Sequence, residues 1–579
     1  MAFQATDEQL QAVELFKRRK PLKISAFAGS GKTSTLLLLA QTRPEKGLYI
    51  AFNKAIAEEA KQKFPKTVDC RTTHSLAFRP VSGQFRFSSG KMTGSLQPWQ
   101  LADTFGLRDQ QFGRIKLDKI GQAFLALGTV RRFCQSDAPG IMQTHVPAYG
   151  RIAAATEEEV KEIRAFVLEK AEELWGRMIN HRDRTPLGHD GYLKLWALQE
   201  PRFAFDYVLL DEAQDSNPAV LGVLGRQDAQ IVYVGDRHQQ IYEWRGAINA
   251  MEKISGGEES YLTRSFRFGE AIAVAASQIL AAMGEKRPIV GNPAVISSIR
   301  PVSSPQAILC RTNAGVMAEV IGTLDRNQTP HVVGGVKELI RMLDDVVSLK
   351  KSEPGTSPEL LGFTNWEEVL RFVQEEEGES LRMFVQLVER FGEMHLLWAV
   401  RRVVDNEKDA HVILSTAHKA KGREWDSVRL SPDFASSKSD NPKTLDDAEC
   451  RLFYVAMTRA KRFLDVAPET LIAFKTRTIP ATQAWPVPKP AVSARATGRV
   501  TPPAEPRPPT PRPVVISPTT TPGASPPARA TPPPLPRAIS AATTPTHAGT
   551  APPVPPPAAK AARGGFIQRL ASLFGARAS

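Results

Sequence analysis

The 579-residue sequence has only four cysteines, no long apolar run and no apolar leader. The cysteines stand far apart without a CxxC pair, which predicts reduced, buried thiols rather than a disulfide framework: Cys70, Cys134, Cys310 and Cys450. No stretch of about 18 apolar residues occurs, so no membrane-spanning helix is expected. The N-terminal MAFQATDEQLQ lacks a basic segment followed by an apolar one, so we expect no signal peptide and a cytoplasmic location.

The net charge of +14 is distributed unevenly. From Pro486 onward the sequence has eleven Lys and Arg residues against a single acid, Glu505, so most of the excess positive charge lies in this tail. A basic total often indicates a nucleic-acid partner, but the charge of the preceding residues is small. A nucleic-acid-binding surface must therefore be identified from local residues.

The first 485 residues alternate apolar strand patterns with helical patterns, which is typical of α/β domains with parallel sheets. Strands are expected in LKISAFAG, GLYIAFN, FDYVLLDEAQD and QIVYVGD, and a second series in QAILCRTN, HVILSTAH and SVRLSPDF. The simplest layout is two α/β units, each interrupted by a mainly helical insertion.

The segment AFAGSGKT, Ala26–Thr33, joins an expected strand to an expected helix and has the composition of a phosphate-binding loop. Gly29 and Gly31 let the backbone curl so that successive N–H groups point at phosphate oxygens, and the helix N-terminus adds its positive dipole end. Lys32 is expected to reach the β- and γ-phosphates, and the Thr33 hydroxyl to bind Mg²⁺. The flanking strand and helix favour this interpretation over a chance glycine-rich turn.

An acidic pair, Asp211 and Glu212, follows the apolar strand YVLL. In a parallel sheet this strand end lies beside the phosphate loop. Asp211 is expected to hold Mg²⁺ through water, and Glu212 to orient and deprotonate the attacking water. Phosphoryl transfer also needs positive charge at the γ-phosphate, for which Arg267 and Arg459 are candidates. Together with the loop, the pair indicates an ATP hydrolase.

In order along the chain, these segments resemble the motifs of superfamily 1 DNA helicases of the UvrD/Rep type. The matching segments are TDEQLQAVE (the Q motif), AFAGSGKT (I), YIAFNKAIAEEA and TTHSLAF (Ia and its neighbour), LLDEAQD (II), GDRHQQIYEWRGA (III), LTRSFRFG (IV), STAHKAKGREWD (V) and ECRLFYVAMTRAKR (VI). HDGYLKLW, SFRFGEAIA and HKAKGREWD further resemble the helicase core of the F-box DNA helicases. No F-box precedes the motor, so no ubiquitin-ligase role is expected.

The resemblance implies two RecA-like motor domains with ATP in the cleft between them. The implied ranges are 1–76 and 200–262 for the first motor domain, 77–199 for a 1B-like insertion, 263–313 and 407–480 for the second motor domain, and 314–406 for a small 2B-like insertion.

The resemblance also implies the roles of individual residues around ATP. Gln9 would read the adenine edge, Gln239 would sense the γ-phosphate, and Arg267 and Arg459 would act as arginine fingers. Phe266 would stack on adenine, and Glu424, next to Gly422, would touch the ribose. The loop contributes Ala28, Gly29, Ser30, Gly31, Lys32, Thr33 and Ser34, the last standing where UvrD-like proteins often have Arg.

A second implied set contacts single-stranded DNA. Aromatic side chains stack on bases, at about 1–3 kcal/mol per base, while hydroxyl and basic groups follow the phosphates. The implied stacking residues are Phe52, Tyr242 and Trp244, and the implied backbone contacts are Asn53, Thr73, His74, Arg245 and His418. The alternatives are a half-buried core position for Trp244 and structural histidines at His74 and His418.

The implied function is an ATP-dependent DNA helicase or translocase that moves 3′ to 5′ on single-stranded DNA and unwinds duplex in repair, recombination or replication. A translocase that strips proteins from single strands shares every motif and stays open. A helicase–nuclease fusion is disfavoured, because a nuclease metal site needs clustered carboxylates and only Glu505 follows Glu469. A non-catalytic scaffold is disfavoured by the intact loop, acids and arginines.

The C-terminal tail has two expected parts. Residues 486–560 hold more than half of the 45 prolines and are expected to form a disordered linker. Residues 561–579 are expected to form a short basic amphipathic helix, which is marginal alone and would order against a partner. Gln568–Phe574, QRLASLF, loosely resembles peptides that dock on bacterial sliding clamps, with a generic partner helix or a sticky basic end as alternatives.

Overall fold

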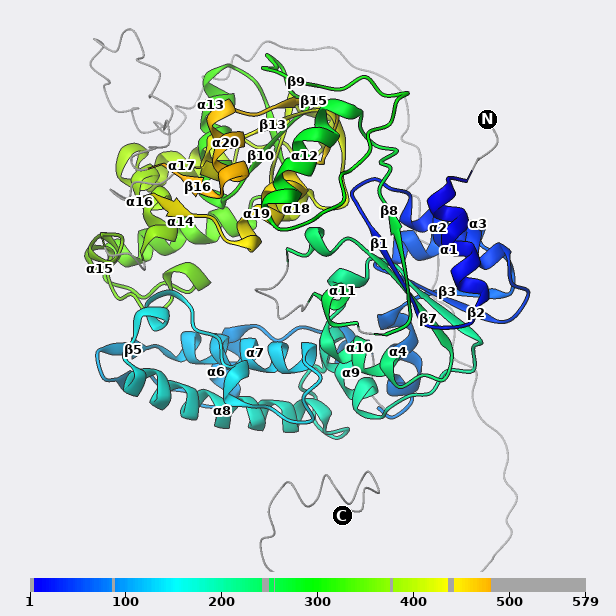
Figure 1. The fold of residues 1–579 in the computed structure, drawn as a ribbon. Coiled ribbons are helices and arrows are strands. Elements are labelled where there is room, and N and C mark those ends of the chain that lie inside the picture. Colours follow the sequence, from blue (N-terminus) through cyan, green and yellow to red (C-terminus); the bar gives the residue numbers. More distant parts are fainter. Residues whose placement is uncertain are drawn as a thin grey trace, which may run out of the picture. The chain divides into compact units, whose positions relative to one another are not determined.

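The computed structural model describes residues 5–85, 89–241, 249–254, 256–374, 378–435 and 442–480. The expected linker at 486–560 and tail helix at 561–579 lie outside these residues, and so do Tyr242, Trp244 and Arg245. The described residues form two six-stranded parallel sheets with helices on their faces, which confirms the predicted α/β class (Figure 1).

The first sheet has the strand order β3-β2-β6-β7-β1-β8, so strands from distant parts of the sequence lie side by side (Figure 1). Its strands are β1 (Leu22–Ala26), β2 (Gly47–Ala51), β3 (Val68–Thr72), β6 (Tyr207–Leu210), β7 (Gln230–Gly235) and β8 (Glu258–Leu262). Strands β2, β6 and β7 are buried along their whole length, as expected where helices cover both faces of a parallel sheet. The parallel order brings the phosphate loop after β1 and the acids after β6 to the same edge.

Helices cover both faces of the first sheet because its side chains alternate between them. Tyr49 packs with the helices that follow β1 and β2, whereas its neighbours Leu48 and Ile50 pack on the opposite face against the first insertion. The helices of this domain are α1 (Asp7–Lys17), α2 (Lys32–Gln41), α3 (Lys54–Lys63), α4 (Thr73–Ser82), α10 (Pro218–Gly225) and α11 (Ala250–Lys253), with 3-10 turns η3 (Ala213–Asp215) and η4 (Arg237–Gln239).

The first insertion, between β3 and β6, is mainly helical and carries one small antiparallel ladder. Its elements are α5 (Ser89–Thr93), α6 (Pro98–Thr104), β4 (Gln110–Phe112), β5 (Ile115–Leu117), α7 (Lys119–Gln135), η1 (Gln143–His145), η2 (Gly150–Ala154), α8 (Glu157–Ile179) and α9 (Gly188–Leu198).

The second sheet has the strand order β11-β12-β10-β13-β15-β9. Its strands are β9 (Ser298–Ile299), β10 (Ala307–Cys310), β11 (Pro330–Val332), β12 (Val412–Thr416), β13 (Trp425–Leu430) and β15 (Ala460–Asp465). The helices of this domain are α12 (Glu270–Ala282), α13 (Asn313–Asp325), α18 (Ala417–Ala420), α19 (Asp447–Met457) and α20 (Pro468–Thr476), with η7 (Glu407–Asp409), η8 (Pro432–Ala435) and the short ladder of β14 (Lys443–Thr444) and β16 (Thr478–Ile479).

The second sheet includes residues that the sequence assigns to the second insertion. The sequence predicts that insertion at 314–406, but β11 pairs with β12 at the edge of the sheet, and α13 leads into β11. The predicted boundary at 314 is therefore wrong, and the insertion begins after β11. The strand was missed because it is three residues long, too short to give a period-two pattern.

The second insertion packs against the first. Its elements are α14 (Lys337–Lys350), η6 (Pro358–Leu360), α15 (Trp366–Phe372), α16 (Glu379–Phe391) and α17 (Glu393–Val400). Leu361 lies in the apolar cluster of the first insertion, and its carbonyl accepts the Arg151 N–H at 3.2 Å. Arg151 also forms an ion pair of 3.1 Å with Glu368. The sequence did not predict this contact.

All four cysteines are buried free thiols, as predicted. In the part of the chain that the structure describes, no helix is long and apolar enough to cross a membrane.

Candidate nucleotide and nucleic-acid site

The phosphate loop between β1 and α2 takes its shape from two glycines. Gly29 has φ +73° and Gly31 has φ +78°, the left-handed region that glycine favours. Gly31 is the N-cap of α2, so the N–H groups of the first turn from Lys32 onward have no intrahelical acceptor and can bind an anion. The Ser30 hydroxyl closes the turn by donating to the carbonyl of Phe27 at 2.8 Å.

Two hydroxyl groups converge on one carboxylate oxygen beside the loop. The Thr33 hydroxyl and the Tyr49 hydroxyl each donate to Oδ2 of Asp211 at 2.8 Å. Burial, and then the neighbouring Glu212, raises the pKa of Asp211. Hydroxyl and carboxylate oxygens are ligands that Mg²⁺ accepts, so Thr33 and Asp211 fit the expected cation. Tyr49 orients Asp211 and is a residue that the sequence did not indicate.

Lys32 and Glu212 form an ion pair across the mouth of the loop, with Nζ and Oε1 at 3.3 Å. Burial opposes the charge of Lys32, but the carboxylates of Glu212, Asp236 and Asp211 outweigh burial and raise its pKa. Burial likewise opposes the charge of Glu212, but Lys32 and then Lys421 lower its pKa. Both groups are therefore ionised.

The backbone around Glu212 is unusual. Glu212 has φ +51°, a left-handed conformation that is uncommon for a residue other than glycine and is often found at functional sites. The Gln214 side-chain amide donates to Oε2 of Glu212 at 2.6 Å and fixes the carboxylate. The conformation and this bond together turn the carboxylate toward Lys32.

Both predicted arginines lie near the loop, Arg459 from the turn before β15 and Arg267 from the segment between β8 and α12. Arg459 is 1% exposed, and its guanidinium donates to Oε1 of Gln239 at 3.2 Å. Burial, and then the nearby Arg267, lowers the pKa of Arg459 to about 9. Arg267 donates to Glu424 at 2.6 Å, and it packs so close to the loop that a Cβ added to Gly29 would lie 2.6 Å from its own Cβ.

The predicted adenine-binding residues lie on one side of the loop. Gln9 is fully buried, and its amide donates to the Thr35 hydroxyl at 3.0 Å. The Phe266 ring is 43% exposed and lies 3.2 Å from where a Cβ on Gly31 would stand. Glu424 is exposed next to Gly422, whose φ is +83°. The structure thus brings Gln9 and Phe266 together, while the Glu424 carboxylate faces Arg267.

Tyr454 is a site residue that sequence reasoning missed. It lies fully buried on α19, and its hydroxyl accepts the Ala28 N–H and donates to the Asp236 carboxylate, both at 3.0 Å. Burial, and then Asp236, raises the pKa of the phenol well above its usual value. The tyrosine stands in the segment that resembles motif VI, but its spacing there does not distinguish it from a core residue.

Lys421 and Asp215 form an ion pair near the phosphate loop that the sequence did not predict. The Lys421 ammonium donates to Asp215 at 2.6 Å and to the carbonyl of Gln239 at 2.5 Å. Burial raises the pKa of Asp215 to about 6, although Lys421 opposes this. Asp215 lies in LLDEAQD and Lys421 in STAHKAKGREWD, so membership of these motifs was the only sequence signal for the pair.

Several predicted DNA contacts lie at the ends of neighbouring strands. Phe52 is 54% exposed after β2, and Asn53 caps α3 by accepting the Ile56 N–H at 2.9 Å. Thr73 and His74 begin α4 directly after β3, which pairs with β2. The structure therefore brings these four residues to one sheet edge.

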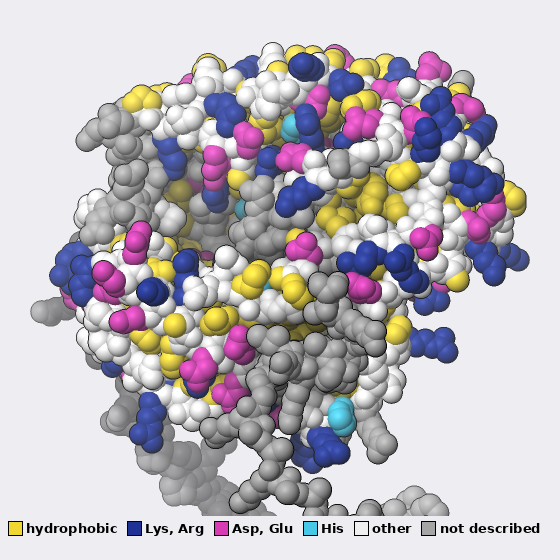
Figure 2. All heavy atoms as spheres, turned by 60° about the horizontal axis from the view of Figure 1, so that its bottom comes forward, with side chains coloured by type: hydrophobic (Ala, Val, Ile, Leu, Met, Phe, Trp, Pro, Cys, Tyr) yellow, Lys and Arg dark blue, Asp and Glu magenta, His cyan; other side chains and the backbone are white. Residues whose placement is uncertain are grey.

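The histidines of the predicted DNA surface differ in setting. The His74 ring is half-buried against His189 and Tyr192 of α9, with centroids 6.0 and 5.9 Å away, and burial lowers its pKa. His418 is half-buried on α18 of the second domain. On the face shown in Figure 2, Lys and Arg side chains form separate groups with acids between them. The described Lys and Arg side chains visible on this face are therefore not joined into one patch.

Comparison with known protein families matches two segments of the chain. The N-terminal domain of UvrD/REP helicases matches residues 140–255, and the UvrD-like helicase C-terminal domain matches residues 336–467.

The most informative relatives are F-box helicases. F-box DNA helicase 1 of Gallus gallus is 30% identical over 497 residues, which cover 77% of this chain and 47% of that protein. F-box DNA helicase protein 1 of Schizosaccharomyces pombe is 31% identical over 509 residues, covering 79% and 57%. DNA helicase II of Escherichia coli is 24% identical over 301 residues, covering 47% and 40%.

The chain spans about half the length of the F-box relatives that it matches. The predicted resemblance is confirmed by both domain matches and by these identities, and the loop, the acids and the arginines lie close together. The chain therefore carries the N-terminal and C-terminal domains of UvrD-like helicases over residues 140–255 and 336–467.

Proposed function

We propose that this chain is an ATP-dependent DNA helicase that moves along single-stranded DNA. The observation that carries the proposal is the hydrogen bond from Arg459 of the second domain to Gln239 of the first, beside the Lys32–Glu212 pair. When two domains share a nucleotide site, hydrolysis can move one domain relative to the other. An ATPase whose site lies within one domain needs no such coupling.

Hydrolysis at this site would use residues of both domains. Thr33 and Asp211 would hold Mg²⁺, which neutralises charge on the phosphates when bound. Lys32 would turn from Glu212 to the phosphates. Because Lys32 lowers the pKa of Glu212, its departure makes that carboxylate a stronger base for the attacking water.

Arg267 and Arg459 would face the charge that develops on the transferred phosphoryl group. Arg459 is held by its Nε–H bond to the carbonyl of Val455 at 2.8 Å, so its position depends on α19. Arg267 is held by Glu424 and by the Thr458 carbonyl, which accepts from it at 3.1 Å. Each hydrolysis event would release these groups and let the domains separate.

Movement along DNA would follow from this opening and closing. Phe52, Thr73 and His74 of the first domain and His418 of the second would hold the strand alternately, with Tyr242 and Trp244 stacking on bases. The family supports 3′-to-5′ movement and a role in DNA repair, recombination or replication, with the two insertions guiding duplex at the junction. These assignments belong to the proposal.

Unwinding assays on three duplexes test the proposal. We expect ATP-dependent strand separation of a 3′-tailed duplex, and none of a 5′-tailed or blunt duplex or with Lys32→Ala. Lys61→Ala is a matched control, because Lys61 forms an exposed ion pair with Glu58 away from the site. Faster separation of the 5′-tailed duplex would show that the chain moves 5′ to 3′ instead. DNA-stimulated ATPase with no unwinding, but with displacement of streptavidin from biotinylated single strands, would indicate a translocase.

A further inference from the structure

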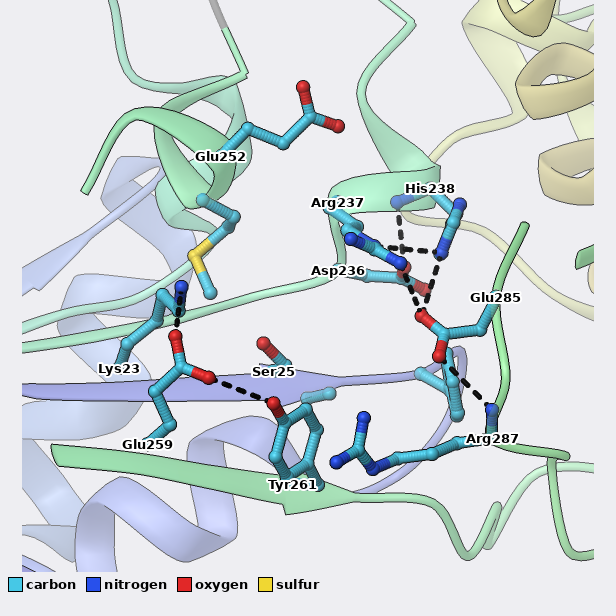
Figure 3. Close-up of a pocket in the computed structure, with 13 residues that line it drawn as sticks. Lys23, Ser25, Asp236, Arg237, His238, Glu252, Glu259, Tyr261, Glu285 and Arg287 are labelled. Atoms are coloured by element: carbon cyan, nitrogen blue, oxygen red, sulfur yellow. Dashed lines mark hydrogen bonds and ion pairs between the residues drawn. The ribbon is translucent and has the colours of Figure 1, made fainter. Parts of the chain in front are cut away.

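The second domain holds the segment Asp236–Gln239 through two sets of contacts. In the first set Arg459 contacts the Gln239 side chain, Lys421 contacts its carbonyl, and Tyr454 contacts Asp236. The second set comes from Glu285, which follows α12 in the chain and points toward Arg237 and His238 in Figure 3. The motifs recognised in the sequence include the residues of the first set only.

Glu285 joins its own turn to two residues of the segment. Its Oε2 accepts from the Arg237 guanidinium at 2.7 Å and lies 3.3 Å from Nε2 of His238. Its Oε1 accepts the backbone N–H groups of Lys286 and Arg287 at 2.9 and 3.1 Å. The side chain is 9% exposed, and the bond with His238, aided by the Arg287 N–H and by Arg237, holds its pKa near 2. The carboxylate is thus ionised where it contacts the segment, and the two N–H groups of its own turn fix its position.

The segment Asp236–Gln239 is short and internally hydrogen-bonded, so its residues are expected to move together. Arg237–Gln239 form a single 3-10 turn, and the Asp236 carboxylate accepts both the His238 N–H at 3.0 Å and the Gln239 amide at 2.7 Å. A displacement of Arg237 or His238 therefore moves the Gln239 side chain that Arg459 contacts.

We infer that Glu285 is a positioning residue that fixes Gln239 for hydrolysis by anchoring Arg237 and His238 to the second domain. The anchor does not touch the nucleotide, and it forms only while the domains are together. Glu285 thereby makes the position of Gln239 depend on domain closure. The inference rests on the proposed function, because it takes Gln239 as the γ-phosphate sensor.

The same cavity offers a matched control. The cavity, of about 320 Å³, has Glu285 on one wall and Glu259 on another (Figure 3). Glu259 pairs with Lys23 and accepts from the Tyr261 hydroxyl at 2.8 Å, all within strands β1 and β8 of the first domain. It lines the same cavity and is also a glutamate, but among the described residues its ion pair and hydrogen bond are with Lys23 and Tyr261 rather than with the Asp236–Gln239 segment.

The test compares Glu285→Ala, Glu285→Gln, Arg237→Ala, the Glu285→Ala/Arg237→Ala double variant and Glu259→Ala in the full chain. The readouts are kcat and KM for ATP with and without single-stranded DNA, and the Tm. We expect Glu285→Ala to lower the DNA-stimulated kcat about tenfold with KM within twofold, and Glu259→Ala to leave both unchanged. Glu285→Gln can still accept hydrogen bonds from the Lys286 and Arg287 N–H groups, so it controls for misfolding of the turn. This variant should lower kcat about threefold or more.

The double variant shows whether the two residues act through their contact. If they do, its kcat equals that of the worse single variant, because each single change already removes the anchor. Multiplicative defects, an equal loss in Glu259→Ala, or a kcat within twofold of wild type for both Glu285 variants would overturn the inference. A wild-type chain without DNA-stimulated ATPase would instead overturn the proposed function, and the DNA-independent kcat would then test the anchor.

Discussion

The backbone N–H of Ala28 donates a hydrogen bond of 3.0 Å to the hydroxyl of Tyr454, 426 positions further along the chain. The same hydroxyl donates to Asp236 at 3.0 Å. One buried oxygen atom thus connects the phosphate loop, the end of β7 and helix α19 of the second domain. The contact ties the loop directly to the second domain.

Tyr454→Phe should weaken this cleft without changing its shape. The substitution leaves the buried Ala28 N–H without its acceptor, which costs about 1–3 kcal/mol. We expect a lower Tm and a DNA-stimulated ATPase rate about tenfold below wild type. Tyr207→Phe is the control, because the buried Tyr207 hydroxyl has no hydrogen-bond partner among the described residues. Equal effects of the two substitutions would contradict a specific role for the Tyr454 hydroxyl.

Gly29→Ala should abolish hydrolysis through a clash with the second domain. Its Cβ would lie 2.6 Å from Cβ of Arg267 and 2.7 Å from the Ser265 hydroxyl. Gly106→Ala is matched for backbone conformation, since Gly106 has φ +60°, but its Cβ would meet nothing within 4 Å. Both changes cost about 1–2 kcal/mol of left-handed strain.

Only Gly29→Ala should also displace Arg267. We expect Gly29→Ala to lower the ATPase rate at least about a hundredfold and Gly106→Ala to lower only the Tm, both measured on purified protein. Normal ATPase in Gly29→Ala would show that the contact between the loop and Arg267 is dispensable.

ATPase activity should rise with pH through about 6 because of Asp215. The ion pair with Lys421 requires ionised Asp215, whose pKa burial raises to about 6. The folding stability should change with pH in the opposite direction. A raised pKa in the folded state means that the folded chain holds the Asp215 proton more tightly than the unfolded chain. The contribution of Asp215 to stability is therefore present below its usual pKa and is lost as the pH rises through about 6. Asp215→Asn should have a lower maximal rate and no step near pH 6. A step that persists in Asp215→Asn would assign the titration to another group.

Trp244→Ala should separate hydrolysis from unwinding. Trp244 lies outside the described residues, so this prediction rests on its motif. Loss of one stacked base costs about 1–3 kcal/mol of DNA binding, while the nucleotide site is untouched. We expect the basal ATPase rate to stay within twofold of wild type and unwinding of a 3′-tailed duplex to fall at least tenfold. Wild-type unwinding would show that Trp244 does not stack on the strand.

The fold class and the strand–loop–helix form of the phosphate loop could be predicted because their signals are local. Lys32 and Thr33 stand directly after the glycines of one strand–loop–helix unit, and Asp211 and Glu212 follow one apolar strand. The boundary at 314 was wrong because the edge strand β11 has only three residues. Its assignment depends on pairing with β12, which begins 80 residues later, and no local pattern reports such a pairing.

The sequence by itself determined the fold class and the family resemblance, since the order of loop, acids and arginines along the chain matches the helicase motifs. Only the tertiary structure decided how those groups are held. Tyr454, Lys421 and Glu285 are ordinary residues in the sequence, and each acquires its role from a partner in the other domain. The physical reason is that a hydrogen bond or ion pair depends on distance in space, and the two parallel sheets bring together residues more than 200 positions apart in sequence.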